Sequence, residues 1–155
     1  MENEMRLSQL HVHEVRRPAI EPACVPRDCS VARLVQEMTE AGTSYLACVI
    51  DADSRLLGVV NIRDLTEYLF PYTAALAQGQ GLLAAQPKSL QECTIDEVMQ
   101  PCEPVHDEQT LDDAARLLMQ SCVSEVPVVD GQQRVIGLIT LHDVLVACRT
   151  ALWQV

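Results

Sequence analysis

Positive charge is scarce in this chain, and the scarcity excludes two classes of partner. The 155 residues include 11 Lys and Arg against 22 Asp and Glu, which gives a formal net charge of −11. A field of that sign repels phosphate backbones and anionic lipid headgroups. We therefore expect no nucleic-acid partner and no membrane partner, and a small anionic ligand would need local positive groups.

Long apolar runs and a leader sequence are also missing. No stretch approaches the roughly 18 consecutive apolar residues of a membrane span. The amino-terminal residues 1–6 are mostly polar and contain no apolar core, so they are unlike a secretory signal. These two absences predict a cytoplasmic protein.

Paired cysteine motifs are absent, although the chain has seven cysteines. No two of them have the Cys-x-x-Cys spacing of a zinc or redox site. Without a secretory signal, the odd count predicts free thiols in a reducing compartment, most of them packed as small hydrophobic side chains. Cys24 and Cys29 remain the alternative as a redox pair, although their spacing in a loop is common by chance.

Catalytic and metal sites have weak support in the sequence. His11 and His13 would share one face of a strand, but no third ligand stands at a suitable spacing. No nucleophile–base pair and no carboxylate pair stands out. We therefore predict no catalytic residues and no metal site.

An internal repeat organises the chain. Residues 49–65 resemble residues 128–144, and four chemically distinctive residues recur at one constant offset. They are Asp51, Arg55, Gly58 and Asp64 in the first stretch, and Asp130, Arg134, Gly137 and Asp143 in the second. Each stretch predicts a short strand, a tight turn, a second strand and a helix.

An amphipathic helix is predicted ahead of each of these stretches. Apolar residues follow Ser30 and Thr110 at i, i+3, i+4 and i+7 spacing. They are Val31, Leu34, Val35 and Met38 in one helix, and Leu111, Ala114, Ala115 and Leu118 in the other. Ser30 and Thr110 are suitable N-caps, because a side-chain oxygen can accept from an unpaired helix N–H. Further upstream, residues 15–18 correspond to residues 98–101.

These patterns predict an α/β, more narrowly an α+β, fold. Two β-α-β-β-α repeats, at residues 10–70 and 94–150, would pack sheet to sheet about a pseudo-two-fold axis, because one such unit rarely buries a full core alone. Residues 71–93 form the linker between them. Their many Ala and Leu residues make the linker too apolar for a free tether, so we expect it to be partly helical and packed.

The second repeat resembles the cystathionine-β-synthase (CBS) type of regulatory domain. The resemblance rests on residues 98–101, on Val123–Asp130 and on Gly137–Asp143, and it covers nearly the whole chain when both repeats are counted. The first repeat is a more divergent copy, with Asn61 in place of Thr140. With no catalytic domain attached, the chain is similar to a stand-alone CBS pair, also called a Bateman module.

The resemblance implies a sensor of adenosine-containing ligands, with AMP, ADP, ATP or S-adenosylmethionine as candidates and no required cofactor. It also implies two ligand clefts between the repeats. The cleft expected to bind more tightly would use His11, Val15, Arg16, Thr43, Ser44, Leu138, Thr140, His142 and Asp143. The weaker cleft would use Val59, Asn61, Arg63, Asp64, Thr94, Val98, Met99, Val123 and Ser124.

The residues at the second helix start can perform this chemistry. Thr140 would open a helix whose N-terminal N–H groups favour an anion, and Asp143 could accept from both ribose hydroxyls. The same Thr-x-x-Asp spacing is also that of a capping box, so a purely structural role stays open. Asn61 weakens the pattern in the first repeat, and Met99 stands where Arg16 stands.

We expect a homodimer. CBS pairs expose apolar helix faces, and the helices that start at Asp64 and Asp143 carry Leu65, Leu69, Phe70, Val144, Leu145, Val146 and Ala147. Trp153 would pack the last helix onto the core or, as the alternative, anchor a dimer contact. A further protein partner would sense the ligand-bound state. The competing functions are a structural dimerisation module with vestigial clefts and a thiol or metal sensor.

Overall fold

The computed structural model describes residues 7–15, 22–40, 45–80, 88–121 and 123–153. The chain divides into two compact units. Unit 2 comprises Ala23–Ala52 and Leu57–Pro101, and unit 1 comprises Met1–Pro22, Asp53–Leu56 and Cys102–Val155. The first segment of each repeat therefore belongs to the unit that contains most of the other repeat.

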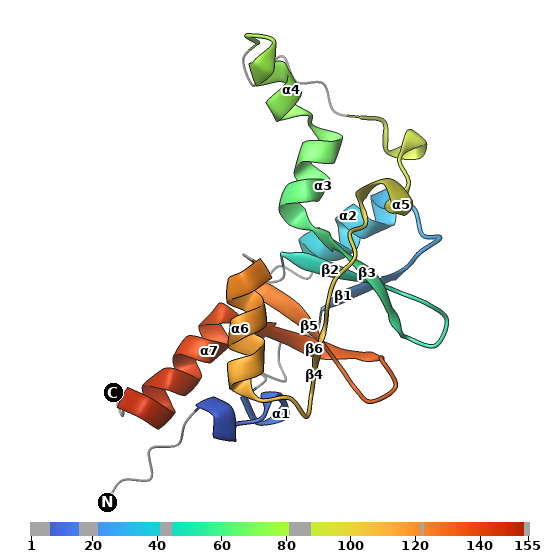
Figure 1. Cartoon of the computed structure of the whole chain (residues 1–155). Helices are drawn as coiled ribbons and strands as arrows, with labels where there is room; N and C mark the ends of the chain where they lie inside the picture. Colours follow the sequence, from blue (N-terminus) through green and yellow to red (C-terminus); the bar gives the residue numbers. More distant parts are fainter. Residues whose placement is uncertain (1–6, 16–21, 41–44, 81–87, 122, 154–155) are drawn as a thin grey trace, which may run out of the picture. The chain divides into compact units, whose positions relative to one another are not determined.

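Unit 2 contains the first repeat (Figure 1). Its sheet has the order β1-β2-β3, with strands at Ala23–Pro26, Leu46–Ile50 and Leu56–Asn61. Strands β1 and β2 run parallel. Its helices are α2 (Val31–Glu40), α3 (Ile62–Leu69), α4 (Tyr72–Ala77) and α5 (Ile95–Val98), with a 3-10 turn at Leu90–Glu92.

Unit 1 contains the second repeat. Its sheet has the order β4-β5-β6, with strands at Val105–His106, Glu125–Val129 and Val135–Thr140. Strands β4 and β5 run parallel, whereas β5 and β6 run antiparallel. Its helices are α1 (Val12–Val15), α6 (Leu111–Ser121) and α7 (Leu141–Cys148), with a 3-10 turn at Leu7–Gln9 and a π-helical turn at Arg149–Trp153.

The predicted α+β fold is confirmed, with a three-stranded sheet and covering helices in each unit. Both predicted amphipathic helices form with three of the four predicted stripe residues buried, while Val35 and Ala115 are half-buried. The buried residues are Val31, Leu34 and Met38 in α2, and Leu111, Ala114 and Leu118 in α6. Both predicted N-caps form: Ser30 Oγ accepts from Arg33 N at 3.1 Å, and Thr110 Oγ1 accepts from Asp113 N at 3.2 Å.

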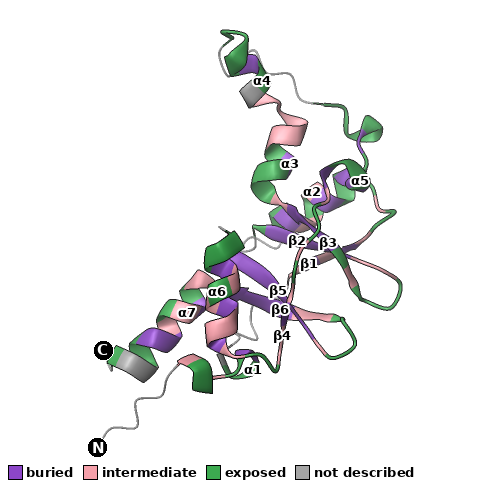
Figure 2. Ribbon diagram, viewed as in Figure 1, coloured by how far each residue is buried: buried purple, intermediate pink, exposed green. Residues whose placement is uncertain are grey.

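Each unit has its own apolar core, built around a buried central strand, β2 or β5 (Figure 2). The segments exchanged between the repeats contribute to these cores. Ile95 and Val98 of α5 are buried in unit 2, and Val12 of α1 is buried in unit 1. Each of these short helices therefore contributes apolar packing to the unit that contains most of the other repeat.

The strand considered for His11 and His13 does not form: His11 makes an isolated β-bridge with Thr110, and helix α1 follows at Val12–Val15. Backbone bonds to the loop ahead of α6 hold this helix: Val12 N donates to Gln109 O at 2.8 Å and His13 N to Asp107 O at 3.1 Å. The two histidine rings nevertheless stack, with centroids 5.5 Å apart. The tertiary hydrogen bonds determine this conformation, and the local spacing of apolar residues does not reveal them.

The expected packing of Trp153 onto the core is also wrong, because its side chain is 60% exposed.

Helices α3 and α7 expose fewer apolar side chains than the sequence suggests. Leu65 and Ala147 are buried within their own units, whereas Leu145 is 58% exposed. Helix α4 forms in the linker with Leu76 exposed, so only part of its surface packs. Within the described ranges, no helix is both long and apolar enough to cross a membrane.

Candidate functional site

The start of α7 in unit 1 carries two predicted ligand residues in one hydrogen-bonded ring. Thr140, the last residue of β6, is extended and caps the helix: its Oγ1 accepts from Asp143 N at 3.1 Å. Asp143 Oδ2 in turn accepts from Thr140 N and from Thr140 Oγ1, both at 2.8 Å. Asp143 is only 2% exposed. The Thr-x-x-Asp pattern is therefore a complete capping box, as the structural alternative anticipated.

Other members of this predicted set lie in the same unit. Helix α1, which follows His11, packs against α7 and α6. His11 is exposed, with Nδ1 3.4 Å from Glu14 Oε2. Leu138 is buried in β6, and His142 is exposed on the first turn of α7. The amino-terminal segment and the start of α7, which are far apart in the sequence, are thus parts of one unit.

The start of α3 in unit 2 is capped differently. Asn61 Oδ1 accepts from Arg63 N at 2.8 Å, and both Arg63 and Asp64 are exposed. A hollow of about 530 Å³ is lined by Arg63 and Asp64 together with Tyr72 of α4. Sequence reasoning missed Tyr72, whose only signal was an aromatic residue directly after Pro71.

The segment after α5 lies beside the same strand. Val59 and Gln100 exchange backbone hydrogen bonds, N to O at 2.9 Å and 2.8 Å. At Gly58 a Cβ atom would stand 2.7 Å from Met99 Cγ, so only glycine allows this approach. Val98 is buried, whereas Thr94 is exposed and makes no side-chain cap bond. Unit 2 therefore brings the Met99–Gln100 segment against Gly58 and Val59 of β3. Strand β3 ends two residues later at Asn61, the N-cap of α3.

The remaining residues of the two predicted sets lie outside the described residues or in the other unit. Arg16, Thr43 and Ser44 lie outside the described residues, and α1 is described at Val15 only by its backbone. Val123 and Ser124, predicted with Asp64, lie in unit 1. There Ser124 O accepts from Leu141 N at 2.9 Å, which places Ser124 at the start of α7.

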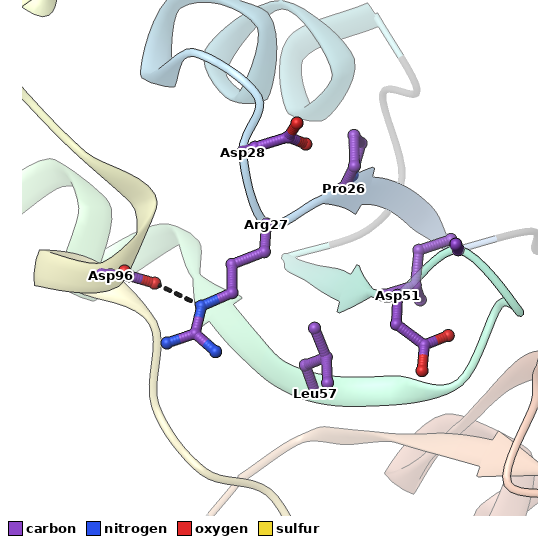
Figure 3. Close-up of a pocket in the computed structure, with 8 residues that line it drawn as sticks. Pro26, Arg27, Asp28, Asp51, Leu57 and Asp96 are labelled. Carbon is purple, nitrogen blue, oxygen red and sulfur yellow. Dashed lines mark hydrogen bonds and ion pairs between the residues drawn. The ribbon is translucent and has the colours of Figure 1, made fainter.

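A further hollow of about 530 Å³ lies at the carboxyl ends of β1 and β2 (Figure 3). Its polar side chains are Arg27, Asp28, Asp51 and Asp96, and its labelled apolar residues are Pro26 and Leu57. Arg27 Nε bonds Asp96 Oδ1 at 2.8 Å, but both side chains are more than half exposed, so this ion pair contributes little stability. None of the predicted site residues that the structure describes lines this hollow.

The charged groups of unit 1 respond to local hydrogen bonds. Hydrogen bonds from the Thr110 side chain and backbone N–H lower the pKa of Asp113. The backbone N–H of His11 lowers the pKa of Glu14.

Burial raises the pKa of the Cys102 thiol to about 11, which makes it a poor nucleophile at neutral pH. The six described cysteines form no disulfide, and the described residues form no group of three His, Cys, Asp or Glu that could hold a metal ion.

Comparison with known proteins gives a consistent family assignment. A family model of the CBS domain matches residues 12–71 and 95–149. The magnesium transporter MgtE of Thermus thermophilus is 29% identical over 107 residues, which is 68% of this chain. Inosine-5'-monophosphate dehydrogenase of Halobacterium salinarum is 25% identical over 111 residues, or 72% of the chain. The matched stretch spans 19% of the length of each of these two relatives.

Solved structures show the same fold. CBSX2 of Arabidopsis thaliana, a CBS-pair protein, is 25% identical with a TM-score of 0.68, covering 91% of this chain and 95% of that one. CBSX2 has also been solved in complex with AMP. The cytosolic domain of MgtE in complex with ATP is 25% identical with a TM-score of 0.61, covering 85% and 46%. The CBS pair of protein MJ0100, with 5'-methylthioadenosine and S-adenosylmethionine, is 21% identical with a TM-score of 0.62, covering 87% and 92%.

Proposed function

Because this chain belongs to the CBS domain family and carries that domain twice, we propose that it is a non-enzymatic regulatory module that binds an adenosine-containing ligand. AMP, ADP, ATP and S-adenosylmethionine are the candidate ligands. Complexes of related CBS pairs with AMP, ATP and S-adenosylmethionine support this ligand class. The bound ligand would be sensed by a dimer mate or by another protein, and by linkage that partner would alter ligand affinity by the same factor.

The observation that carries the proposal is the packing of α1 against α7. It places the segment after His11 in one unit with the helix start that holds Thr140 and Asp143. An N-terminal helix turn favours a phosphate, and a carboxylate suits ribose hydroxyls. Arg16 would add a bidentate phosphate contact. We therefore propose that the set containing Asp143 binds more tightly than the set containing Asp64.

A structural dimerisation module is the second candidate function. The capping box favours it, because Thr140 and Asp143 already satisfy each other and Asp143 is almost fully buried. Under this alternative, the residues at both helix starts would stabilise helices and bind nothing.

Calorimetric titration with AMP, ATP and S-adenosylmethionine separates the two functions. In Asp143→Asn the amide oxygen can still accept from Thr140, so the cap is largely kept while the ribose acceptor loses its charge. We expect the tighter binding event to weaken by roughly one to two decades. Asp113→Asn is the matched control, because Asp113 closes the same kind of capping box with Thr110 in α6. Absence of binding at millimolar ligand, or unchanged binding by Asp143→Asn, would favour the structural module.

We also propose that the chain forms a homodimer. Unit 1 exposes three large apolar side chains, Met119, Leu145 and Trp153, each at least 58% exposed. Exposed apolar side chains of this size are common at interfaces between protein chains. Light scattering at micromolar concentration should give about twice the 17.1 kDa of one chain. A monomer mass would overturn this assignment.

A further inference from the structure

Tyr68 of α3 joins three chain segments of unit 2. Its hydroxyl donates a short hydrogen bond to Glu97 Oε2 in α5. The Lys88 ammonium stands 4.0 Å from the centroid of its ring, a cation–π contact. Lys88 N also donates to Leu69 O at 2.8 Å, at the end of α3. The segment that begins at Lys88 and leads into α5 is thus attached to α3 by both side chain and backbone.

The attached segment leads directly to the residues beside β3. Glu97 is followed by Val98, which is buried, and then by Met99 and Gln100, which contact Gly58 and Val59. Strand β3 and helix α3 are consecutive and meet at Asn61. Helix α5 is therefore attached to β3 through Gln100 and to α3 through Tyr68, in addition to its apolar packing and the Arg27–Asp96 ion pair.

We propose that Tyr68 is a positioning residue, which fixes the Glu97–Gln100 segment against β3 and so sets the geometry of the candidate ligand site that contains Val59, Asp64 and Met99. The proposal rests on the proposed function, because it assigns a role to one of its two sites. Tyr68 itself would not touch the ligand. Its hydroxyl hydrogen bond to a carboxylate is of the charge-assisted class, which is stronger than a neutral bond.

The Tyr68 hydroxyl is a hydrogen-bond donor at physiological pH. The hydrogen bond to Glu97, with burial as the second cause, raises the pKa of Tyr68 above its ordinary value. The hydroxyl therefore stays protonated, and remains a donor to Glu97, throughout the physiological pH range.

Tyr68→Phe tests the proposal because it removes the hydroxyl and keeps the ring. Hydrogen exchange should show the amides of Met99 and Gln100 exchanging roughly tenfold faster or more, with Leu34 of α2 unchanged. In titrations with AMP, the binding event abolished by Asp64→Ala should weaken by a similar factor, and the event weakened by Asp143→Asn should not change. Tyr45→Phe is the control, because Tyr45 is 62% exposed.

Each possible result of the Tyr68→Phe experiment tests a different part of the proposal. Unchanged exchange at Gln100 overturns the proposal whatever AMP does, and so does an equal increase throughout unit 2, which would indicate general destabilisation. Faster local exchange with unaltered AMP binding shows that the attachment does not shape the site. If the wild-type chain binds none of AMP, ATP and S-adenosylmethionine, the proposed function fails and the ligand role of Tyr68 fails with it, while the exchange result still decides whether Tyr68 holds the segment. A Glu97→Ala variant should reproduce Tyr68→Phe, and the double variant should add little.

Discussion

Helix α7 in unit 1 and helix α3 in unit 2 begin at corresponding points of the two repeats, yet their carboxylates are in different environments. Asp143 is buried and bonded to Thr140, whereas Asp64 is exposed. The N-cap residue explains the difference. Thr140 Oγ1 accepts from one group and donates to another, whereas Asn61 Oδ1 can only accept, and it accepts from Arg63 N.

This difference has a functional consequence. At the start of α7, any ligand role of Asp143 is tied to helix stability, because the same carboxylate closes the capping box. At the start of α3, the cap belongs to Asn61 alone and Asp64 is accessible. In the first repeat, Asn61 in place of Thr140 therefore leaves helix capping to residue 61 and leaves Asp64 accessible to a ligand. In the second repeat, Asp143 would have to serve both helix capping and ligand binding.

Gly58 gives the largest expected effect, because unit 2 depends on the close approach of Met99 and Gln100 to β3. A Cβ there would lie 2.7 Å from Met99 Cγ and 2.8 Å from the Gln100 carbonyl oxygen. We expect Gly58→Val to lower the free energy of unfolding by about 3 kcal/mol, at the upper end of overpacking effects. Urea unfolding measures it. Gly131→Val is the control, since no atom lies within 4 Å of its Cβ position, and equal losses would contradict the contact.

The next largest effect is a direct contrast between the two carboxylates. We expect Asp143→Ala to lower the free energy of unfolding by about 1–2 kcal/mol, because it opens a buried capping box. Asp64→Ala should change it by less than about 0.5 kcal/mol, because Asp64 is exposed. Asp113→Ala should resemble Asp143→Ala. Thermal unfolding of the three variants provides the comparison, and similar losses for Asp64 and Asp143 would show that the two helix starts are equivalent.

The sequence was sufficient for features that depend on local spacing. The apolar stripes of α2 and α6 and the caps at Ser30 and Thr110 follow from residue type and helical period, and each is present. The repeat itself shows in the matched turns, where Ser54 and Gln133 both adopt a positive φ. These features need only neighbours along the chain, so one sequence contains the information.

Features that depend on contacts between residues far apart in the sequence could not be predicted from local patterns. Helix α1 forms where its N–H groups meet the carbonyls of Asp107 and Gln109, which no local pattern indicates. Tyr68 and Glu97 are far apart in the sequence, so their hydrogen bond had no signal. The capping box at Thr110 could have been found, because Asp113 stands three residues on, as Asp143 does after Thr140.

A smaller effect is expected from acid on the closed capping box of α6. Thr110 lowers the pKa of Asp113 in the folded state, so the stability from this group is present above the unfolded value of about 3.9. It is lost as the pH falls through the folded pKa. Asp113→Asn and Thr110→Val should therefore both flatten the dependence of stability on pH below about 4. Carboxyl NMR titration checks this directly, and an Asp113 that titrates at its ordinary pKa would contradict it.

The smallest effect is expected from converting one helix start into the other. Asn61→Thr gives α3 the hydroxyl that closes the capping box of α7, and Asp64 stands at the correct spacing to accept from residue 61. Asn and Thr are both good N-caps, so the gain in the free energy of unfolding should be no more than about 0.5 kcal/mol. The sharper measurement is hydrogen exchange at the amide of residue 61, which should slow when the Asp64 carboxylate accepts from it. The reverse change, Thr140→Asn, should speed exchange at residue 140 and lower stability by about 1 kcal/mol, because a buried Asp143 then loses its hydroxyl donor. If Asn61→Thr leaves exchange at residue 61 unaltered, the backbone of α3, and not the cap residue, keeps Asp64 exposed.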